Sequence, residues 1–337
     1  MRGKTITGCM IQGSKSRLDV IDAMQGIAML WVVVGHHLFD FMPHFYSRLH
    51  HYIYIFHMPF FIFISSFLIA YSYKGQPYHK YVYMRFRKFF VPYVVIGIII
   101  TMLAAFKDGL ESIPANLLCL IVSPKQSEAT FLWYIYMLFF LYAVFPLCVK
   151  ACERIGTYFE ILLLAVGIYL YCNPAITPIL CLDYFSGYLL FYAIGIVVAW
   201  HLSFFKKHLR TFKIVSALAL VVFIVLTATV FTQSGQWMAY MILCFSAIPA
   251  MYFIACIVVE HVSVVKNVLV AISRNCFHIY LVHMFFVQAM AAVFSFVPIK
   301  LSAVGMFAYL TISTLIAIVG SVLFFKIYGS IKSKLYN

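Results

Sequence analysis

The chain has 337 residues, of which 65% belong to the hydrophobic set and 10% are charged, and its formal net charge is +14. Soluble domains carry about 25% charged residues, so this composition excludes a water-soluble globular protein, a disordered chain, a collagen and a coiled coil. The 24 Lys and Arg lie in short gaps between apolar runs, a pattern that indicates membrane topology and argues against a nucleic-acid partner.

Ten apolar stretches follow one another along the chain, each close to the roughly 20 residues that a helix needs to cross a bilayer. They cover approximately residues 20–41, 51–73, 89–106, 130–149, 157–173, 184–202, 212–231, 237–259, 277–297 and 302–327. A shorter apolar segment, 113–122, is the candidate for an eleventh, interfacial helix. The gaps leave no room for a soluble domain. The sequence therefore predicts an all-α polytopic membrane protein, with one transmembrane domain over residues 1–337 and a bundle of about ten helices.

The distribution of basic residues predicts the orientation of this bundle. If the N-terminus is cytoplasmic, 20 of the 24 Lys and Arg fall in cytoplasmic segments, and the exceptions are Arg48, Lys107, Lys125 and Lys300. Cytoplasmic loops carry the excess of positive charge in membrane proteins. We therefore expect both termini in the cytoplasm, with residues 1–19 as a short N-terminal segment before an uncleaved first span.

The first span carries a polar stripe. Steps of three and four residues place Asp22, Gln25, Met29, Val32 and His36 on one face of a helix. Gln25 and His36 lie about 16 Å apart along its axis, and His37 points about 100° away from His36. An ionisable residue inside a membrane is by default a functional candidate, and we favour His36 because it lies on the stripe. The alternative is a histidine that only hydrogen-bonds a neighbouring helix.

The second span places His57 at a depth similar to that of His36, and Pro59 follows it two residues later. Proline removes an N–H and clashes with the preceding turn, so it is expected to kink this helix and to open space beside His57. The alternative is a histidine that is satisfied at a helix end next to a packing kink.

The next cytoplasmic loop and the start of the third span, residues 80–93, contain Arg85, Arg87 and Lys88 among aromatic residues. Arginine forks match phosphate oxygens and lysine supplies a point charge, so this cluster is a candidate phosphate site. The alternative is a basic loop that anchors the topology against anionic lipid.

Signals in the later spans are weaker. Trp133 opens the fourth span at its outer end, where an aromatic belt is expected and where a shelf for sugar rings is the alternative. His278 and His283 lie in the inner part of the ninth span, about 140° apart around the helix. The sequence contains no Walker loop, GxSxG, HExxH or dinucleotide fingerprint, and its histidines form no matched ligand set, so we expect no metal.

Several of these segments, taken in order, resemble the acyltransferase-3 family of integral-membrane O-acyltransferases, which modify bacterial surface polysaccharides, and they look closest to its fucose 4-O-acetylase-like branch. The matching pieces are RLDVIDAMQGIAMLWVVVGH at 17–36, IFHMPFFIFISSFL at 55–68, YVYMRFRKFFVPY at 81–93, FLWYIYMLFFLYAVFPL at 131–147 and IYLVH at 279–283. The resemblance spans most of the chain and agrees with the ten-helix core of that family.

The resemblance implies roles for individual residues. His36 would be the catalytic histidine of the first span, and Asp22 the acidic residue of a DxxRG-like start. Gln25 stands where the family usually has Arg or Lys, eleven residues before the histidine. Arg85 and Lys88 match an RxxR feature with lysine in the second place, which keeps the charge and loses the bidentate geometry. The residues expected to line the substrate channel are Gln25, His37, Trp133 and His283.

The implied reaction moves an acetyl group from cytoplasmic acetyl-CoA to a hydroxyl of a surface or lipid-linked glycan, in a bacterial inner membrane. His36 would act as general base with Asp22 and His57 as orienting partners. Arg85, Arg87 and Lys88 would hold the CoA phosphates, and membrane lipid surrounds the protein. The alternative function is a glycan exporter or flippase without catalysis, although residues 1–150 and 180–337 lack the related halves common in transporters.

Overall fold

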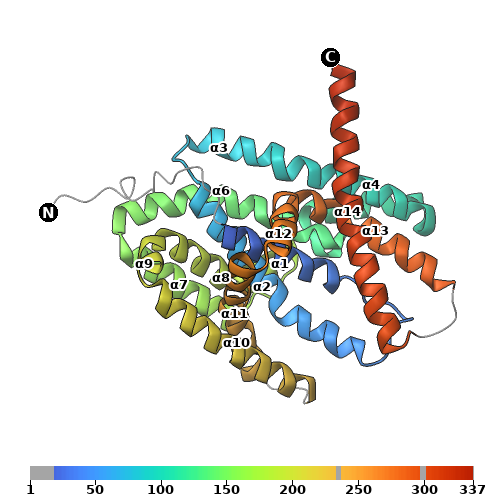
Figure 1. The fold of residues 1–337 in the computed structure, drawn as a ribbon. Coiled ribbons are helices and arrows are strands. Elements are labelled where there is room, and N and C mark those ends of the chain that lie inside the picture. The colour runs from blue at the N-terminus through green and yellow to red at the C-terminus, as the bar shows by residue number, and fades with distance from the viewer. Residues whose placement is uncertain (1–18, 233–236, 297–300, 337) are drawn as a thin grey trace. The chain divides into compact units, whose positions relative to one another are not determined.

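A computed structural model describes residues 19–232, 237–296 and 301–336, in which every regular element is a helix. Figure 1 shows these helices in chain order. They are α1 (Asp19–Gly35), α2 (Tyr46–Ser72), α3 (Tyr78–Arg85), α4 (Val91–Asp108), α5 (Ile113–Val122), α6 (Trp133–Ile155), α7 (Thr157–Cys172), α8 (Leu182–Trp200), α9 (Leu202–Lys207), α10 (Leu209–Thr232), α11 (Trp237–His261), α12 (Ser263–Arg274), α13 (Cys276–Ser295) and α14 (Ala303–Tyr336). The predicted N-terminal segment lies almost wholly outside the described residues.

Eight helical stretches within the described ranges are long and apolar enough to cross a membrane, and they correspond to eight of the ten predicted spans. The other two predicted spans, 20–41 and 157–173, contain the helices α1 and α7, which have 17 and 16 residues. Helix α1 is shorter than predicted because the chain leaves the helix after Gly35, whereas the apolar composition continues to residue 41. The apolar segment 113–122 forms a helix, α5, as predicted.

Helix α12 was not predicted, because Lys266 and Arg274 gave its segment the composition of a connecting loop. The helix is amphipathic. Leu269 and Ile272 are buried, whereas the polar residues Asn267 and Arg274 are exposed. A short amphipathic helix therefore joins α11 to α13.

The helices group into two compact units. The first contains residues 65–203, and the second contains residues 17–64 together with 204–337. In the first unit α7 packs on α8, and α6 packs on α3. In the second unit α10 packs on α11, α1 on α12, and α13 on α14.

Helices α1 and α12 approach each other closely at Gly26. A Cβ atom at this position would lie 2.9 Å from the Cα of Leu269, closer than such atoms approach in real structures. Only glycine therefore allows the two backbones to pack at this distance. The contact fixes the first half of α1 against α12 within the second unit.

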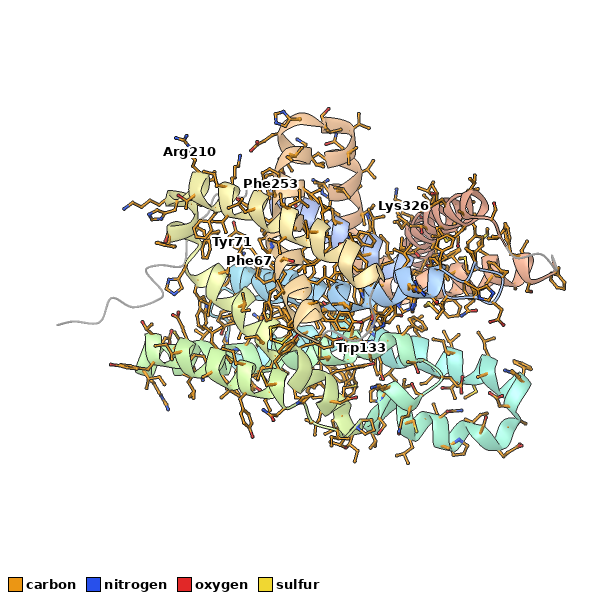
Figure 2. The ribbon with its side chains drawn as sticks, turned by 90° about the horizontal axis from the view of Figure 1, so that it is seen from below. Phe67, Tyr71, Trp133, Arg210, Phe253 and Lys326 are labelled. Atoms are coloured by element: carbon orange, nitrogen blue, oxygen red, sulfur yellow. The ribbon has the colours of Figure 1, made fainter. Side chains whose placement is uncertain are left out.

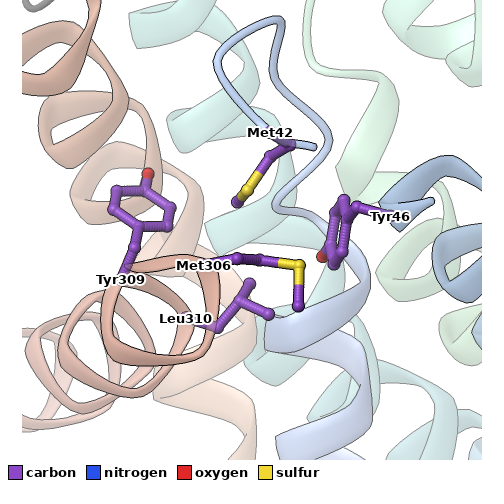
Figure 3. Close-up of a cluster of buried hydrophobic side chains, with 5 residues drawn as sticks. All are labelled: Met42, Tyr46, Met306, Tyr309 and Leu310. Carbon is purple, nitrogen blue, oxygen red and sulfur yellow. The ribbon is translucent and has the colours of Figure 1, made fainter. Parts of the chain in front are cut away.

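The segment that follows α1 is fixed by α14. Met42 and Tyr46 pack against α14 in one buried cluster, and Figure 3 shows the five side chains together. The three partners from α14 are Met306, Tyr309 and Leu310. The Tyr46 hydroxyl also donates a hydrogen bond of 3.3 Å to the carbonyl of Val34 in the last turn of α1. This packing holds the C-terminal end of α1, where the histidines lie.

Candidate active site

His36 is the first residue beyond α1. Its backbone N–H donates to the Val33 carbonyl at 3.1 Å, which closes a tight final turn, and its side chain is half-buried. The imidazole ring faces that of His283 on α13, with ring centres 5.1 Å apart and planes tilted by 46°. The sequence had not predicted this contact, because counting residues from the ends of the apolar runs placed the two histidines at different depths.

His283 is completely buried, and its tautomer follows from its hydrogen bonds. Nδ1 lies 2.8 Å from the Tyr280 carbonyl and 3.1 Å from the Ile279 carbonyl of its own helix. A carbonyl only accepts, so Nδ1 carries the proton and Nε2 carries the lone pair. The ring therefore turns a hydrogen-bond acceptor away from α13.

His57 on α2 is held in the same way. Its Nδ1 lies 2.9 Å from the Ile53 carbonyl, which leaves the lone pair on Nε2. That Nε2 lies 3.8 Å from the position of a Cβ built on Gly35, the residue before His36. His57 is 2% exposed, and Pro59 lies inside α2 as predicted. The end of α1 is therefore flanked by one acceptor imidazole from α2 and another from α13.

Two residues of α2 that sequence reasoning missed extend this cluster. The Tyr54 ring lies 4.6 Å from that of His57 and 4.3 Å from that of His50. The spacing of 50, 54 and 57 puts all three on one helix face, and this signal was available in the sequence. Tyr54 is 42% exposed, so the cluster has an open side. Three imidazoles meet at the end of α1, those of His36, His57 and His283. Because His57 and His283 are buried, His36 is the most accessible of the three.

His37 has a different environment. Its Nδ1 donates to the Val33 carbonyl at 2.8 Å, and its Nε2 lies 2.8 Å from the Ser313 hydroxyl of α14. The side chain is completely buried. With both ring nitrogens engaged, these contacts favour a structural tie between α1 and α14 over the predicted place in a channel.

Asp22 and Gln25 lie near the other end of α1. Both accept from the Ser273 hydroxyl at the end of α12, at 3.2 Å and 2.7 Å. The next residue of the predicted stripe, Met29, contacts the Cys276 thiol at 3.6 Å. Asp22 is fourteen residues from His36, about 21 Å along the helix, so any influence on His36 is indirect.

The predicted phosphate cluster belongs to the first unit. Arg85 ends α3, and Arg87 and Lys88 lie exposed in a single π-helical turn, Phe86–Phe90. Such turns recur at functional sites. The Arg85 guanidinium carbon lies 4.9 Å from the Tyr81 ring centre and 4.5 Å from that of Tyr142 on α6. Two tyrosines therefore hold this guanidinium in place.

Trp133, labelled in Figure 2, begins α6 and is 8% exposed. Its ring centre lies 4.1 Å from that of Tyr184 and 5.7 Å from that of Tyr188, and the second pair is stacked. These tyrosines cover the indole, which leaves little face for a sugar ring. Beside them Lys125 donates to Asp183 at 2.8 Å, and this hydrogen bond raises the pKa of Lys125.

The described residues contain no set of side chains arranged as ligands for a metal ion. No group of three or more His, Cys, Asp or Glu side chains in them is arranged to hold a metal ion. The Nδ1 atoms of His37, His57 and His283 each donate to a backbone carbonyl.

A family model described as an acyltransferase domain matches residues 18–326. The chain belongs to the acyltransferase-3 family. The match confirms the resemblance at the level of the family, and the acyltransferase-3 region includes both the histidines of the second unit and the basic turn of the first. No curated protein and no solved structure matches the chain. Together with the apolar helices, family membership makes this protein a membrane acyltransferase.

Proposed function

We propose that this acyltransferase moves an acetyl group from acetyl-CoA to a hydroxyl of a surface or lipid-linked glycan, as in the fucose 4-O-acetylase-like branch, with His36 as general base. The observation that carries the proposal is the placement of His36. Its ring is half-buried, and it lies beside buried imidazoles with assigned tautomers at the end of α1. This arrangement gives one reachable nitrogen base in apolar surroundings.

The chemistry requires a base of this kind. An alcohol attacks a thioester efficiently only when its proton is removed as the new C–O bond forms, and imidazole titrates near neutral pH. The C–S bond then breaks and CoA leaves as the thiolate, which takes the proton back from His36. A positioned base contributes typically about 10²- to 10⁴-fold, and orientation of the two substrates supplies much of the rest.

The donor would bind at the basic turn. Arg85 is held between Tyr81 and Tyr142, whereas Arg87 and Lys88 are exposed. An oriented guanidinium beside two flexible cations suits a ligand with several phosphates, because the fork binds oxygens in pairs and the neighbouring charges neutralise the others. We assign the phosphates of CoA to this cluster.

The proposed setting is a bacterial inner membrane. The excess of Lys and Arg on one side of the predicted spans supports ten crossings with both termini in the cytoplasm, where acetyl-CoA is available. In this orientation Gln25 lies toward the cytoplasmic end of α1, and His36 lies toward the outer end, where a glycan acceptor would approach.

The decisive experiment uses the full chain in proteoliposomes with labelled acetyl-CoA and a lipid-linked glycan acceptor. We expect His36→Ala to lower kcat by at least about 10²-fold, since it removes the base. The matched control is His44→Ala, which removes an exposed histidine from the same connecting segment and leaves kcat unchanged.

Two outcomes would contradict the proposal. A His36→Ala variant that acetylates at the wild-type rate would exclude this residue from the chemistry. A wild-type protein that moves the glycan across the vesicle membrane without forming an ester would identify an exporter.

A further inference from the structure

The geometry points to Tyr54 of α2 as the residue that binds the sugar ring of the acceptor beside His36. This inference rests on the proposed function, because it assigns a protein contact to the proposed glycan acceptor. Both residues belong to the second unit. Tyr54 forms no bond and exchanges no proton in the reaction, and its role is to hold the ring that carries the reacting hydroxyl.

Tyr54 lies at the end of α1. A Cβ built on Gly35 would lie 3.5 Å from Cε2 of Tyr54, which is an ordinary van der Waals distance. The ring therefore rests against the residue that precedes His36, whose Cα is about 3.8 Å further along the chain. The ring centres of His50 and His57 lie 4.3 Å and 4.6 Å from that of Tyr54. His36 is close enough to these same two imidazoles to interact with them electrostatically, so Tyr54 and His36 share two neighbours.

Helix packing does not use the ring of Tyr54 as it uses other aromatic rings of α2. Tyr52 and Phe56 are buried, and both of their rings contact Phe223 of α10. Tyr54 lies on a different face of the helix and is 42% exposed. A large aromatic side chain with this much uncovered surface, next to the proposed base, is available to a ligand.

The surroundings of Tyr54 favour a sugar over a lipid chain as that ligand. A pyranose carries C–H groups on its faces and hydroxyls around its rim, so it suits an aromatic surface with polar groups beside it. Tyr54 supplies the aromatic surface, and the half-buried imidazole of His50 lies beside it. A lipid chain at this place would cover the imidazole without offering it a hydrogen bond, which costs free energy.

The requirements of the base place the sugar in the same region. A general base acts on a hydroxyl within about 2.6–3.2 Å, so the sugar ring that bears this hydroxyl lies next to His36. Tyr54 provides an exposed aromatic surface there. Trp133, which the sequence offered as an alternative shelf for sugar rings, is instead covered by Tyr184 and Tyr188. The aromatic contact to the acceptor is therefore assigned to α2 and not to the start of α6.

The test compares two substitutions at position 54 in proteoliposomes with labelled acetyl-CoA, and its acceptor is methyl α-L-fucopyranoside. Tyr54→Leu keeps apolar bulk against Gly35 and removes the aromatic ring, whereas Tyr54→Phe keeps the ring. Loss of one aromatic contact should raise the KM for the sugar by about three- to tenfold in Tyr54→Leu. We expect its kcat and its KM for acetyl-CoA to stay unchanged, because the contact binds the acceptor in the ground state and the transition state alike. The conservative variant Tyr54→Phe should keep the KM for the sugar within about twofold of the wild type.

The matched control is Phe45→Leu, which makes the same change at an aromatic residue that is 41% exposed and directly precedes α2. It should leave all three kinetic constants unchanged. Equal rises in the KM for the sugar in Tyr54→Leu and Phe45→Leu would overturn the inference, because both rings would then act only as aromatic anchors at the membrane interface. An unchanged KM for the sugar in Tyr54→Leu would overturn it as well, and so would a loss confined to kcat.

Saturation-transfer NMR on the full chain in nanodiscs gives a second readout, which needs no turnover. We expect transfer from the wild-type protein to the ring protons of methyl α-L-fucopyranoside, its loss in Tyr54→Leu and its retention in Tyr54→Phe. Equal transfer in the two variants would overturn the inference, as would a wild-type protein that shows no transfer. A wild-type protein that binds the sugar through Tyr54 and forms no ester would instead contradict the proposed function and support the assignment of Tyr54.

Discussion

The Ser273 hydroxyl lies 2.7 Å from Oε1 of Gln25 and 3.2 Å from Oδ1 of Asp22, and so ties the end of α12 to the start of α1. A hydroxyl has one proton, so the two acceptors share a single donor. The bridge lies three turns or more from His36, about 16 Å along the axis from Gln25. A cation at position 25 would therefore act near the N-terminal end of the helix and not on the reacting atoms.

The distance of about 16 Å along the axis between Gln25 and His36 predicts the effect of Gln25→Arg. The new guanidinium would pair with Asp22, three residues earlier on the same face, and neutralise a negative charge on the side from which the proposed anionic donor would enter. We expect the KM for acetyl-CoA to fall by roughly two- to tenfold, with kcat unchanged. Asn267→Arg, which adds the same charge at an exposed position of the connecting helix α12, is the control. A change in kcat confined to Gln25→Arg would show that position 25 acts on the chemical step.

The sequence predicted the helical class and the polar stripe of α1 because both depend on local composition and on helical spacing. The residues at 22, 25 and 29 contact the same neighbouring segment, through Ser273 and Cys276. The pairing of His36 with His283 was not predictable in this way. It joins residues 247 positions apart, and it depends on α1 ending at Gly35, a feature that hydropathy does not record.

Recognition of the family gave His36 its proposed role, yet the environment of that residue came from the structure. The sequence treated His37 as a second channel histidine, whereas Val33 and Ser313 engage both of its ring nitrogens. It also left the tyrosines around Arg85 without a role, because Tyr142 lies 57 residues away on α6. Local patterns identify the kinds of side chains present, and long-range packing decides which of them meet.

The contact between His37 and Ser313 predicts a structural effect. Ser313→Ala leaves Nε2 of a completely buried ring without its partner, which costs about 1–3 kcal/mol of unfolding free energy. We expect a lower melting temperature in detergent and an unchanged kcat. Ser295→Ala, at an exposed serine of α13, serves as the control and should leave the melting temperature unchanged. A loss of kcat without a loss of stability would instead place His37 in the reaction.

The position of Arg85 predicts that Arg85→Lys weakens the binding of acetyl-CoA. Lysine keeps the charge but cannot stack a planar group between Tyr81 and Tyr142 or present a fork to phosphate. Losing about 0.5–2 kcal/mol of this interaction raises the KM for acetyl-CoA by up to about thirtyfold. Arg48→Lys, at an exposed arginine near the start of α2, should leave KM unchanged. Similar KM values for Arg85→Lys and Arg48→Lys would show that the basic turn only anchors the membrane topology.

Leu180 and Leu182 provide a test of backbone strain near Asp183. Their side chains are 45% and 44% exposed, so removing either one sacrifices comparable packing. Leu180 has a φ of 53°, whereas Leu182 begins α8 with a φ of −62°. A left-handed conformation costs a residue with a Cβ about 1–2 kcal/mol, a cost that glycine avoids.

We therefore expect Leu180→Gly to raise the melting temperature in detergent and Leu182→Gly to lower it. Glycine also loses about 0.5–1 kcal/mol through its greater freedom in the unfolded chain, which reduces the gain at 180 and accounts for the loss at 182. The two variants should consequently differ in unfolding free energy by roughly 1–2 kcal/mol. Equal melting temperatures would show that the turn before α8 stores no strain. A lower melting temperature for Leu180→Gly alone would show that the exposed leucine contributes packing that outweighs its conformation.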